Sequence, residues 1–192
     1  MTTSPLTTEQ WLVRPTALPV IRRRCLRCRS AEYRTDGKFR VNANHKLLDV
    51  WLLALCAGCG ETIKLTVLER VTVRAIDPQT LTRFHDNDPS MALQLLTDPG
   101  LSRRNSITLD WAWDLRKTDV ADAETVEISV GFLQRIPIRR TGLLSVGLEV
   151  SRSEVQRQIA AGTITSADRL DGTSAGDFSF THQRKRPTEY GA

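Results

Sequence analysis

All four cysteines of the chain fall into two Cys-x-x-C pairs, Cys25 with Cys28 and Cys56 with Cys59. A Cys-x-x-C pair places two thiolates on one tight turn, and two such turns supply the four sulfurs of a tetrahedral zinc site. Four sulfur ligands leave zinc no open coordination position for a substrate or a water molecule. The spacing therefore predicts a structural Zn2+ ion bound by these four cysteines.

Arginines crowd the first pair, and their positive charge favours thiolate over thiol and therefore metal over proton. They are Arg22, Arg23, Arg24, Arg27 and Arg29. Other interpretations of the cysteines stay open. A redox-active pair needs a strand–helix unit after the motif, whereas residues 61–73 alternate as a strand does. Two disulfides suit a secreted protein, but the N-terminus lacks the pattern of a secretory signal. Four unliganded buried thiols fit poorly with the identical spacing of the two pairs.

The composition of the chain is that of a globular protein without a membrane span. Hydrophobic residues make up 40% and charged residues 26% of 192 residues, and the net charge is +5. No apolar run reaches the length of a transmembrane helix, so we expect no membrane partner and a cytoplasmic location. The chain has no P-loop, no Gly-x-Ser-x-Gly, no His-Glu-x-x-His and only three scattered histidines. These absences predict that the protein is not an enzyme.

Hydrophobic periodicity and turn residues predict an α+β fold. Strands of an antiparallel, zinc-ribbon-like domain include an extended edge segment at Trp11, a hairpin turning at Asp36-Gly37 and a strand that delivers Cys56. Two helices starting at Asp77-Pro78 and Asp88-Pro89 follow, and residues 107–115 and 125–133 read as a β-hairpin. The predicted segments are a polar lead (1–10), the zinc-ribbon-like domain (11–75), the helical pair with the β-hairpin (76–135), a C-terminal αα helix pair (136–170) and a disordered basic tail (171–192).

The strand-rich stretch around the second cysteine pair carries a family resemblance. Its sequence is KFRVNANHKLLDVWLLALCAGCGETIKLTVLER, over residues 38–70, with WLVRP and PVIRRRCLRC before it. This pattern closely resembles an uncharacterised bacterial family known as domain of unknown function 1062. The resemblance extends over most of the chain and implies the architecture of that family, but it implies no particular activity.

Residues 138–164 have the pattern of two short helices. Leucines form the first helix, which we expect to end at Gly147, and Ser151 with Glu154 forms a capping box for the second, closed by Gly162. The pair resembles the alpha-L RNA-binding motif of a ribosomal small-subunit protein, of pseudouridine synthases and of tyrosyl-tRNA synthetases. The residues that match are Gly147, Leu148, Ser151, Arg152, Ile159, Gly162 and Ile164. Residues 165–168 depart from the hairpin that usually follows in this motif.

Four arginines around the helix pair predict contacts with the phosphates of a structured RNA, made by charge and shape. They are Arg139, Arg140, Arg152 and Arg157. Ordinary helix packing and a protein partner are the alternatives for the same surface. The sequence thus predicts a nonenzymatic, zinc-binding RNA-binding module. The alternative is a zinc-stabilised protein-interaction or regulatory module that binds no nucleic acid.

Overall fold

A computed structural model describes residues 7–118 and 123–184 of the chain, which have an α+β fold with five α-helices in the described part. The chain divides into two compact units. The cysteine unit is Thr16–Ala112, and the terminal unit combines Met1–Pro15 with Trp113–Ala192. This division differs from the five predicted segments, because the terminal unit is assembled from both ends of the chain. Each unit is described by itself.

The sheet of the cysteine unit is antiparallel throughout, with the order β4-β5-β3-β2-β7 and with β6 on the other side of β5. The long central strand β5 alternates buried and partly exposed residues, so that one face of the sheet forms the core. The strands are β2 (Val20–Arg22), β3 (Glu32–Arg34), β4 (Phe39–Asn44), β5 (Leu47–Cys56), β6 (Thr62–Thr72) and β7 (Thr108–Asp110).

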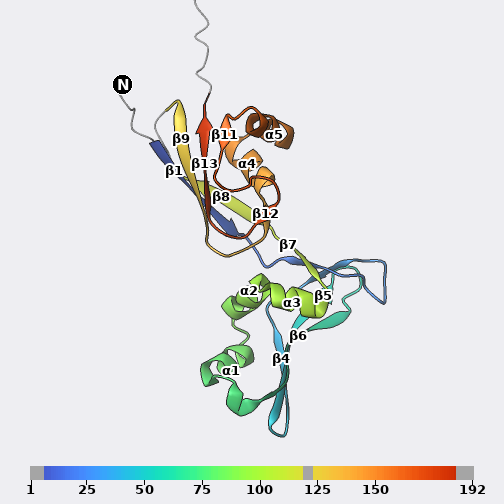
Figure 1. The fold of residues 1–192 in the computed structure, drawn as a ribbon. Helices are drawn as coiled ribbons and strands as arrows, with labels where there is room; N and C mark the ends of the chain where they lie inside the picture. Colours follow the sequence, from blue (N-terminus) through green and yellow to red (C-terminus); the bar gives the residue numbers. More distant parts are fainter. Residues whose placement is uncertain (1–6, 119–122, 185–192) are drawn as a thin grey trace, which may run out of the picture. The chain divides into compact units, whose positions relative to one another are not determined.

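A 3-10 turn, η1 (Val73–Ala75), leads from β6 into three helices (Figure 1). Each of them begins with an aspartate cap followed by proline, as the sequence predicted for the first two. The third Asp-Pro, at Asp98, follows the last residue of α2 and caps a further helix, which was not predicted, by accepting a hydrogen bond from Gly100 N. The helices are α1 (Pro78–His85), α2 (Pro89–Thr97) and α3 (Pro99–Asn105).

Asn105, the last residue of α3, protects the outer edge of β6. Its Oδ1 accepts a hydrogen bond from Thr66 N (2.7 Å), and its Nδ2 donates to Thr66 O (3.1 Å). The buried carboxamide thus replaces the backbone of a missing neighbouring strand at this point. A second Nδ2 hydrogen bond, to Leu101 O (3.0 Å), fixes the carboxamide to its own helix. Unpaired strand edges invite intermolecular pairing, so this contact also blunts an edge.

The predicted hairpin at Asp36-Gly37 does not form. β3 pairs with β5 instead of β4, and β4 pairs with β5 through the turn at His45. Residues 42–44 are the end of β4. The reason is that β5 is long enough to pair β3 near its end and β4 along the rest, which satisfies the backbone hydrogen bonds of both strands. Gly37 still needs its positive φ of 84°, for the bend that leads into β4.

The main sheet of the terminal unit has the order β11-β13-β9-β1-β8. β1 is parallel to β9, and the other pairs are antiparallel. A second, two-stranded sheet joins β10 and β12. Figure 1 shows β1, β9 and β13 side by side, near the helices α4 and α5. The elements are β1 (Thr7–Pro15), β8 (Trp113–Lys117), β9 (Thr125–Phe132), β10 (Ile138–Arg139), α4 (Arg140–Leu148), α5 (Arg152–Ala160), β11 (Ile164–Thr165), β12 (Thr173–Ser174) and β13 (Phe178–Gln183).

Trp11 is the centre of the core of the terminal unit. Its side chain is 2% exposed, and its ring makes an edge contact with Phe180 at 5.3 Å between centroids. Its Nε1 donates to the buried carboxylate of Glu9 at 2.7 Å. Gly147 of α4 lies against the same ring, where a Cβ would come within 2.2 Å of it. Gly147 therefore does not end the helix as predicted; it lets the helix approach Trp11, and α4 continues to Leu148.

Several sequence predictions for this unit are wrong. β1 is an internal strand and Trp11 packs in this unit, because both edges of β1 find partners in β9 and β8. Residues 107–115 and 125–133 form no hairpin with each other: β7 joins the sheet of the cysteine unit, and β8 pairs with β1. Residues 7–10 of the polar lead belong to β1, and residues 178–183 of the tail form β13, whose buried phenylalanines complete the core. The rest of the lead (1–6) and of the basic tail (185–192) lies outside the described residues.

Candidate metal centre

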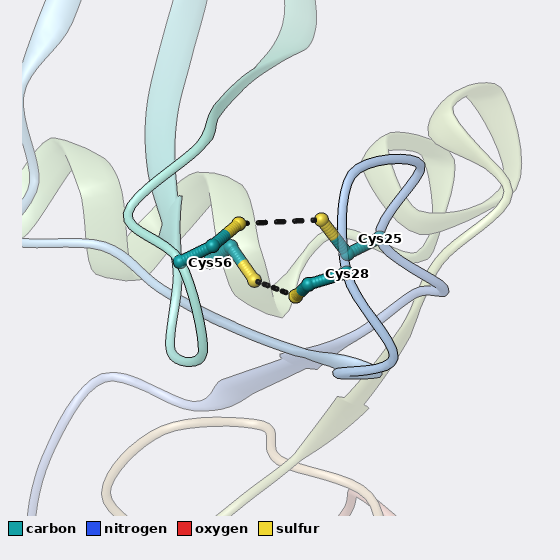
Figure 2. A group of neighbouring side chains, drawn as sticks. Cys25, Cys28 and Cys56 are labelled. Atoms are coloured by element: carbon teal, nitrogen blue, oxygen red, sulfur yellow. Dashed lines mark hydrogen bonds between the residues drawn. The ribbon is translucent and has the colours of Figure 1, made fainter.

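The four cysteines come together at one end of the sheet of the cysteine unit. Cys25 and Cys28 lie in the loop between β2 and β3, Cys56 ends β5, and Cys59 lies in the turn before β6. Their four Sγ atoms all lie within 4.8 Å of one another. Cys25 Sγ is 3.8 Å from Cys59 Sγ, and Cys28 Sγ is 3.5 Å from Cys56 Sγ. Figure 2 shows Cys25 and Cys28 on one loop, with Cys56 facing them from another. The predicted clustering of the cysteines is confirmed.

The sulfur positions fit a tetrahedral metal ion. Zinc–sulfur bonds of about 2.3 Å imply sulfurs about 3.8 Å apart at the corners of a tetrahedron. A disulfide would need its sulfurs about 2.05 Å apart, and all four cysteines are free thiols. Four soft thiolate donors are the ligands that zinc and iron–sulfur centres use. The cluster is thus consistent with a structural metal.

Backbone N–H groups point at the sulfurs in the same way in both turns. Arg27 N donates to Cys25 Sγ at 3.4 Å, and Gly58 N donates to Cys56 Sγ at 3.4 Å. Each donor stands two residues after the cysteine that accepts the hydrogen bond. Such hydrogen bonds stabilise thiolates and orient them for a metal ion. The repeated geometry explains why the two Cys-x-x-C pairs share one spacing.

Gly58 is required by the closeness of the two turns. A Cβ at this position would lie 3.0 Å from Ser30 Cβ and 3.2 Å from Cys28 Sγ, both on the opposite loop. These separations are shorter than ordinary van der Waals contacts, so a side chain would push the two cysteine pairs apart. Glycine thus allows the second turn to approach the first, in addition to any freedom of its own backbone.

Tyr33 supports the cluster from within the core, and sequence reasoning missed it. Tyr33 lies in β3, is 1% exposed and stands opposite Cys56 in the β3–β5 register. Its hydroxyl donates to the Cys25 sulfur, and together with the Arg27 N–H this lowers the pKa of the Cys25 thiol to about 6. The same hydrogen bond raises the pKa of Tyr33 above its usual value. No local motif marks Tyr33, because its place depends on strand pairing.

The protonation of the cluster favours a cation among the sulfurs. The pKa of Cys28 is raised to about 12. The hydrogen bond from the Ser30 N–H lowers this pKa, but its effect is outweighed by the thiol of Cys56, by burial and by the other two cysteines, which all raise it. One thiolate thus makes the ionisation of its neighbours costly in the absence of a positive charge. A bound metal ion supplies that charge and allows all four thiols to ionise.

The four arginines predicted to bind RNA do not form one exposed set. Arg140 packs over the Phe178 ring at 4.5 Å and donates to Ser174 Oγ and Arg169 O, so that its side chain is only 14% exposed. Arg139 and Arg152 are exposed, and Arg157 is exposed but paired with Glu154. Arg140 is therefore bound up within the terminal unit, and only the other three arginines are accessible around the helix pair.

The helix pair itself is present as α4 and α5. Ser151 caps α5 by accepting a hydrogen bond from Glu154 N at 3.2 Å, as predicted. The Glu154 carboxylate accepts from Gln158 Nε2 at 2.8 Å and pairs with Arg157, so it does not complete the predicted capping box with Ser151 N. After α5 the chain enters β11, which pairs with β13 of the main sheet. Two helices in this order do not by themselves identify the alpha-L motif, so the resemblance to that motif stays a prediction.

A cleft of about 660 Å3 lies between β6 and the three helices of the cysteine unit. This volume is in the range of ligand pockets. Its polar groups are engaged in structural contacts: Arg83 binds Asp88, and Asp77 and Asp98 cap helices. Arg104 donates to a backbone carbonyl of β6. Because these groups already serve the fold, the cleft offers no converging set of groups for chemistry.

Comparison with known proteins places the chain in a family. The model of a protein family of unknown function, DUF1062, matches residues 41–170, and the chain belongs to this family. The family prediction made from the sequence is thereby confirmed. The matched range contains the second cysteine pair and the helix pair, while the first cysteine pair precedes it. Searches of curated proteins and of solved structures found no match. In the described residues, every helix is too short or too polar to cross a membrane.

Proposed function

We propose that the protein is a nonenzymatic binding protein whose cysteine cluster holds a structural Zn2+ ion. The observation that carries this proposal is the set of four sulfurs within 4.8 Å of one another. With all four ligands supplied by the chain, a tetrahedral ion has no position for a reacting molecule. The ion clamps the β2–β3 loop to the turn after β5, as in a zinc ribbon. Binding of structural zinc contributes on the order of 10 kcal/mol to the folding of small domains.

Metal analysis of the purified protein tests this proposal. The wild-type chain should carry about one zinc ion per chain, and Cys56→Ser should lose zinc and stability together. Leu26→Ala is the control, because Leu26 lies between the two cysteines of the first pair, is exposed and is not a ligand. It should keep both zinc and stability. A stable Cys56→Ser variant with unchanged metal content would contradict four-sulfur ligation, and iron in place of zinc would contradict the assignment of the ion.

A second candidate function is RNA binding by the α4–α5 helix pair. The exposure of Arg139, Arg152 and Arg157 supports it, because accessible guanidinium groups can contact phosphates without disturbing the core. The helix-pair variant, with these three arginines changed to glutamine, should bind a structured RNA hairpin more weakly than the wild type. It should also show a shallower dependence of affinity on salt, in anisotropy titrations between about 50 and 200 mM KCl. If the wild-type protein binds no RNA but binds one discrete protein partner, the result would favour the alternative that the protein is a protein-interaction module.

A further inference from the structure

The loop that carries the first cysteine pair presents an exposed, basic surface. We name residues 22–29 (RRRCLRCR) the arginine loop. All six of its non-cysteine side chains are exposed, and Leu26 at the tip is 97% exposed. In the metal-binding turn, therefore, the sulfurs face inward while the arginines and the leucine face solvent.

Two of the five arginines in the arginine loop are paired with acidic residues. Arg22 binds Asp110 at 2.7 Å and also binds Glu32, and Arg27 binds Glu61 at 3.0 Å. The carboxylates of Glu32, Asp110 and Glu61 thus form their ion pairs with these two guanidinium groups. The remaining three, Arg23, Arg24 and Arg29, have no ion pair within residues 7–118 and 123–184. We refer to them as the unpaired arginines.

The backbone beneath the unpaired arginines is ordered by hydrogen bonds. Arg23 N donates to Ala31 O at 3.0 Å, and Cys25 N donates to Ser30 O at 2.9 Å. A metal ion on Cys25 and Cys28 would cross-link the same loop to the turn after β5. An ordered loop loses less conformational entropy on binding than a flexible one, so its charges are preorganised for a ligand.

We propose that the arginine loop is a nucleic-acid contact surface that binds the phosphodiester backbone through Arg23, Arg24 and Arg29. Guanidinium groups match phosphate oxygens with paired N–H donors and are less strongly hydrated than ammonium groups. A phosphodiester chain carries a negative charge at every residue, so one strand can engage all three guanidiniums. Leu26 stands among them and offers an apolar contact to sugars and base faces. This surface lies in the cysteine unit and is independent of the helix pair.

Salt-dependent binding of nucleic acid to the zinc-loaded full chain tests the proposal. The probes are fluorescein-labelled 20-residue oligo(U) and oligo(dT), titrated by anisotropy at several KCl concentrations. The loop variant carries Arg23→Gln, Arg24→Gln and Arg29→Gln. Three lost contacts to a single strand should lower the slope of log affinity against log salt by about 2, and affinity at low salt should fall about tenfold or more. An equal loss of affinity for both probes indicates contacts with the phosphodiester backbone. A loss of affinity for one probe alone would contradict such backbone contacts.

A charge-matched control separates the arginine loop from the overall charge of the protein. Arg74, Arg103 and Arg116 are exposed arginines elsewhere in the chain, and their change to glutamine removes the same charge. This control should alter the affinity less than twofold, and the loop variant should keep the zinc content of the wild type. An equal loss in the control would overturn the proposal, as would wild-type protein that binds neither probe at about 50 mM salt.

Two further arms separate this proposal from its alternatives. If the helix-pair variant loses binding while the loop variant retains it, the arginine loop is not the contact surface, although RNA binding by the helix pair stands. If the loop variant loses binding while the helix-pair variant retains it, the arginine loop is the contact surface and the proposal of RNA binding by the helix pair is contradicted. Poly-glutamate at the same charge concentration should compete weakly; complete displacement of the oligonucleotide would show that the surface does not prefer phosphodiesters to carboxylates and would overturn the proposal.

Discussion

Replacement of Gly147 by alanine should destabilise the terminal unit, although alanine is the better helix former. Gly147 is buried in α4, and a Cβ there would lie 2.2 Å from two ring carbons of Trp11 and 2.8 Å from a third. The ring has little freedom to withdraw, because it packs against Phe180 and its Nε1 is bonded to the buried Glu9 carboxylate. The added methyl group therefore forces either the helix or the indole ring to move.

The expected magnitude follows from two opposing effects. Overpacking of a well-packed core costs about 1–3 kcal/mol. Alanine in place of glycine within a helix contributes up to about 1 kcal/mol in the other direction. We expect a net loss of about 1–2 kcal/mol in the free energy of unfolding. The loss rises if the indole ring gives up its hydrogen bond to Glu9, since an unsatisfied buried polar group costs about 1–3 kcal/mol.

Gly142 provides the matched control, because it is another buried glycine of α4. A Cβ at Gly142 would meet the Arg152 guanidinium at 3.5 Å, which is an ordinary contact with a movable side chain. Gly142→Ala should therefore gain up to about 1 kcal/mol from helix propensity. Urea unfolding, with hydrogen exchange of the α4 and β1 amides, measures both variants. Gly147→Ala that is as stable as Gly142→Ala would refute the packing argument, whereas a Trp11→Leu change should relieve the damage in a double-mutant cycle.

Three further predictions concern the cysteine unit. Asn105→Ala should cost about 1–3 kcal/mol in urea unfolding, because it leaves the edge N–H and C=O of Thr66 unpaired; an unchanged midpoint would contradict this. Tyr33→Phe should remain folded but bind zinc about 10–100-fold more weakly in competition with a chromophoric chelator, as loss of an outer-shell hydrogen bond does; equal affinity would remove Tyr33 from the metal centre. Arg83, and then Ser90, lower the pKa of Asp88 to about 2 from 3.8, so Asp88 stabilises the fold above pH 3.8 and loses this effect as the pH falls through about 2. The difference in melting temperature between wild type and Asp88→Asn should accordingly shrink between pH 5 and pH 2, and a constant difference would contradict the ion pair.

The residue types of the candidate metal centre were readable from the sequence because each Cys-x-x-C turn is local. In each turn the short Cys-x-x-C spacing is enough to let a backbone N–H reach the sulfur of the cysteine two residues before it, as Gly58 N reaches Cys56 Sγ. The meeting of the two pairs was a prediction that strand pairing fulfilled. Tyr33 could not be predicted, since its hydroxyl reaches Cys25 only through the β3–β5 register. The same register replaced the hairpin expected at residues 36–37.

Helix starts in the cysteine unit were predictable for a similar reason. Asp-Pro combines a side-chain acceptor for free N–H groups with a φ angle that suits the first turn, so Asp77 and Asp88 mark helices without tertiary help. At Asp98 the same dipeptide directly follows the last residue of α2 and also starts α3, a helix that the sequence analysis did not predict.

The sequence by itself determined the set of four clustered cysteines, the helix caps, the α+β class and the family. Each of these depends on side chains and backbone groups that lie close together along the chain. Only the tertiary structure decided that β1 pairs in parallel with β9 and that the segment containing Phe178 and Phe180 is a core strand. It also decided that the Arg140 guanidinium packs over the Phe178 ring. These contacts join distant segments, and their free energy comes from apolar burial and backbone pairing, which many alternative partners in the chain could also have supplied.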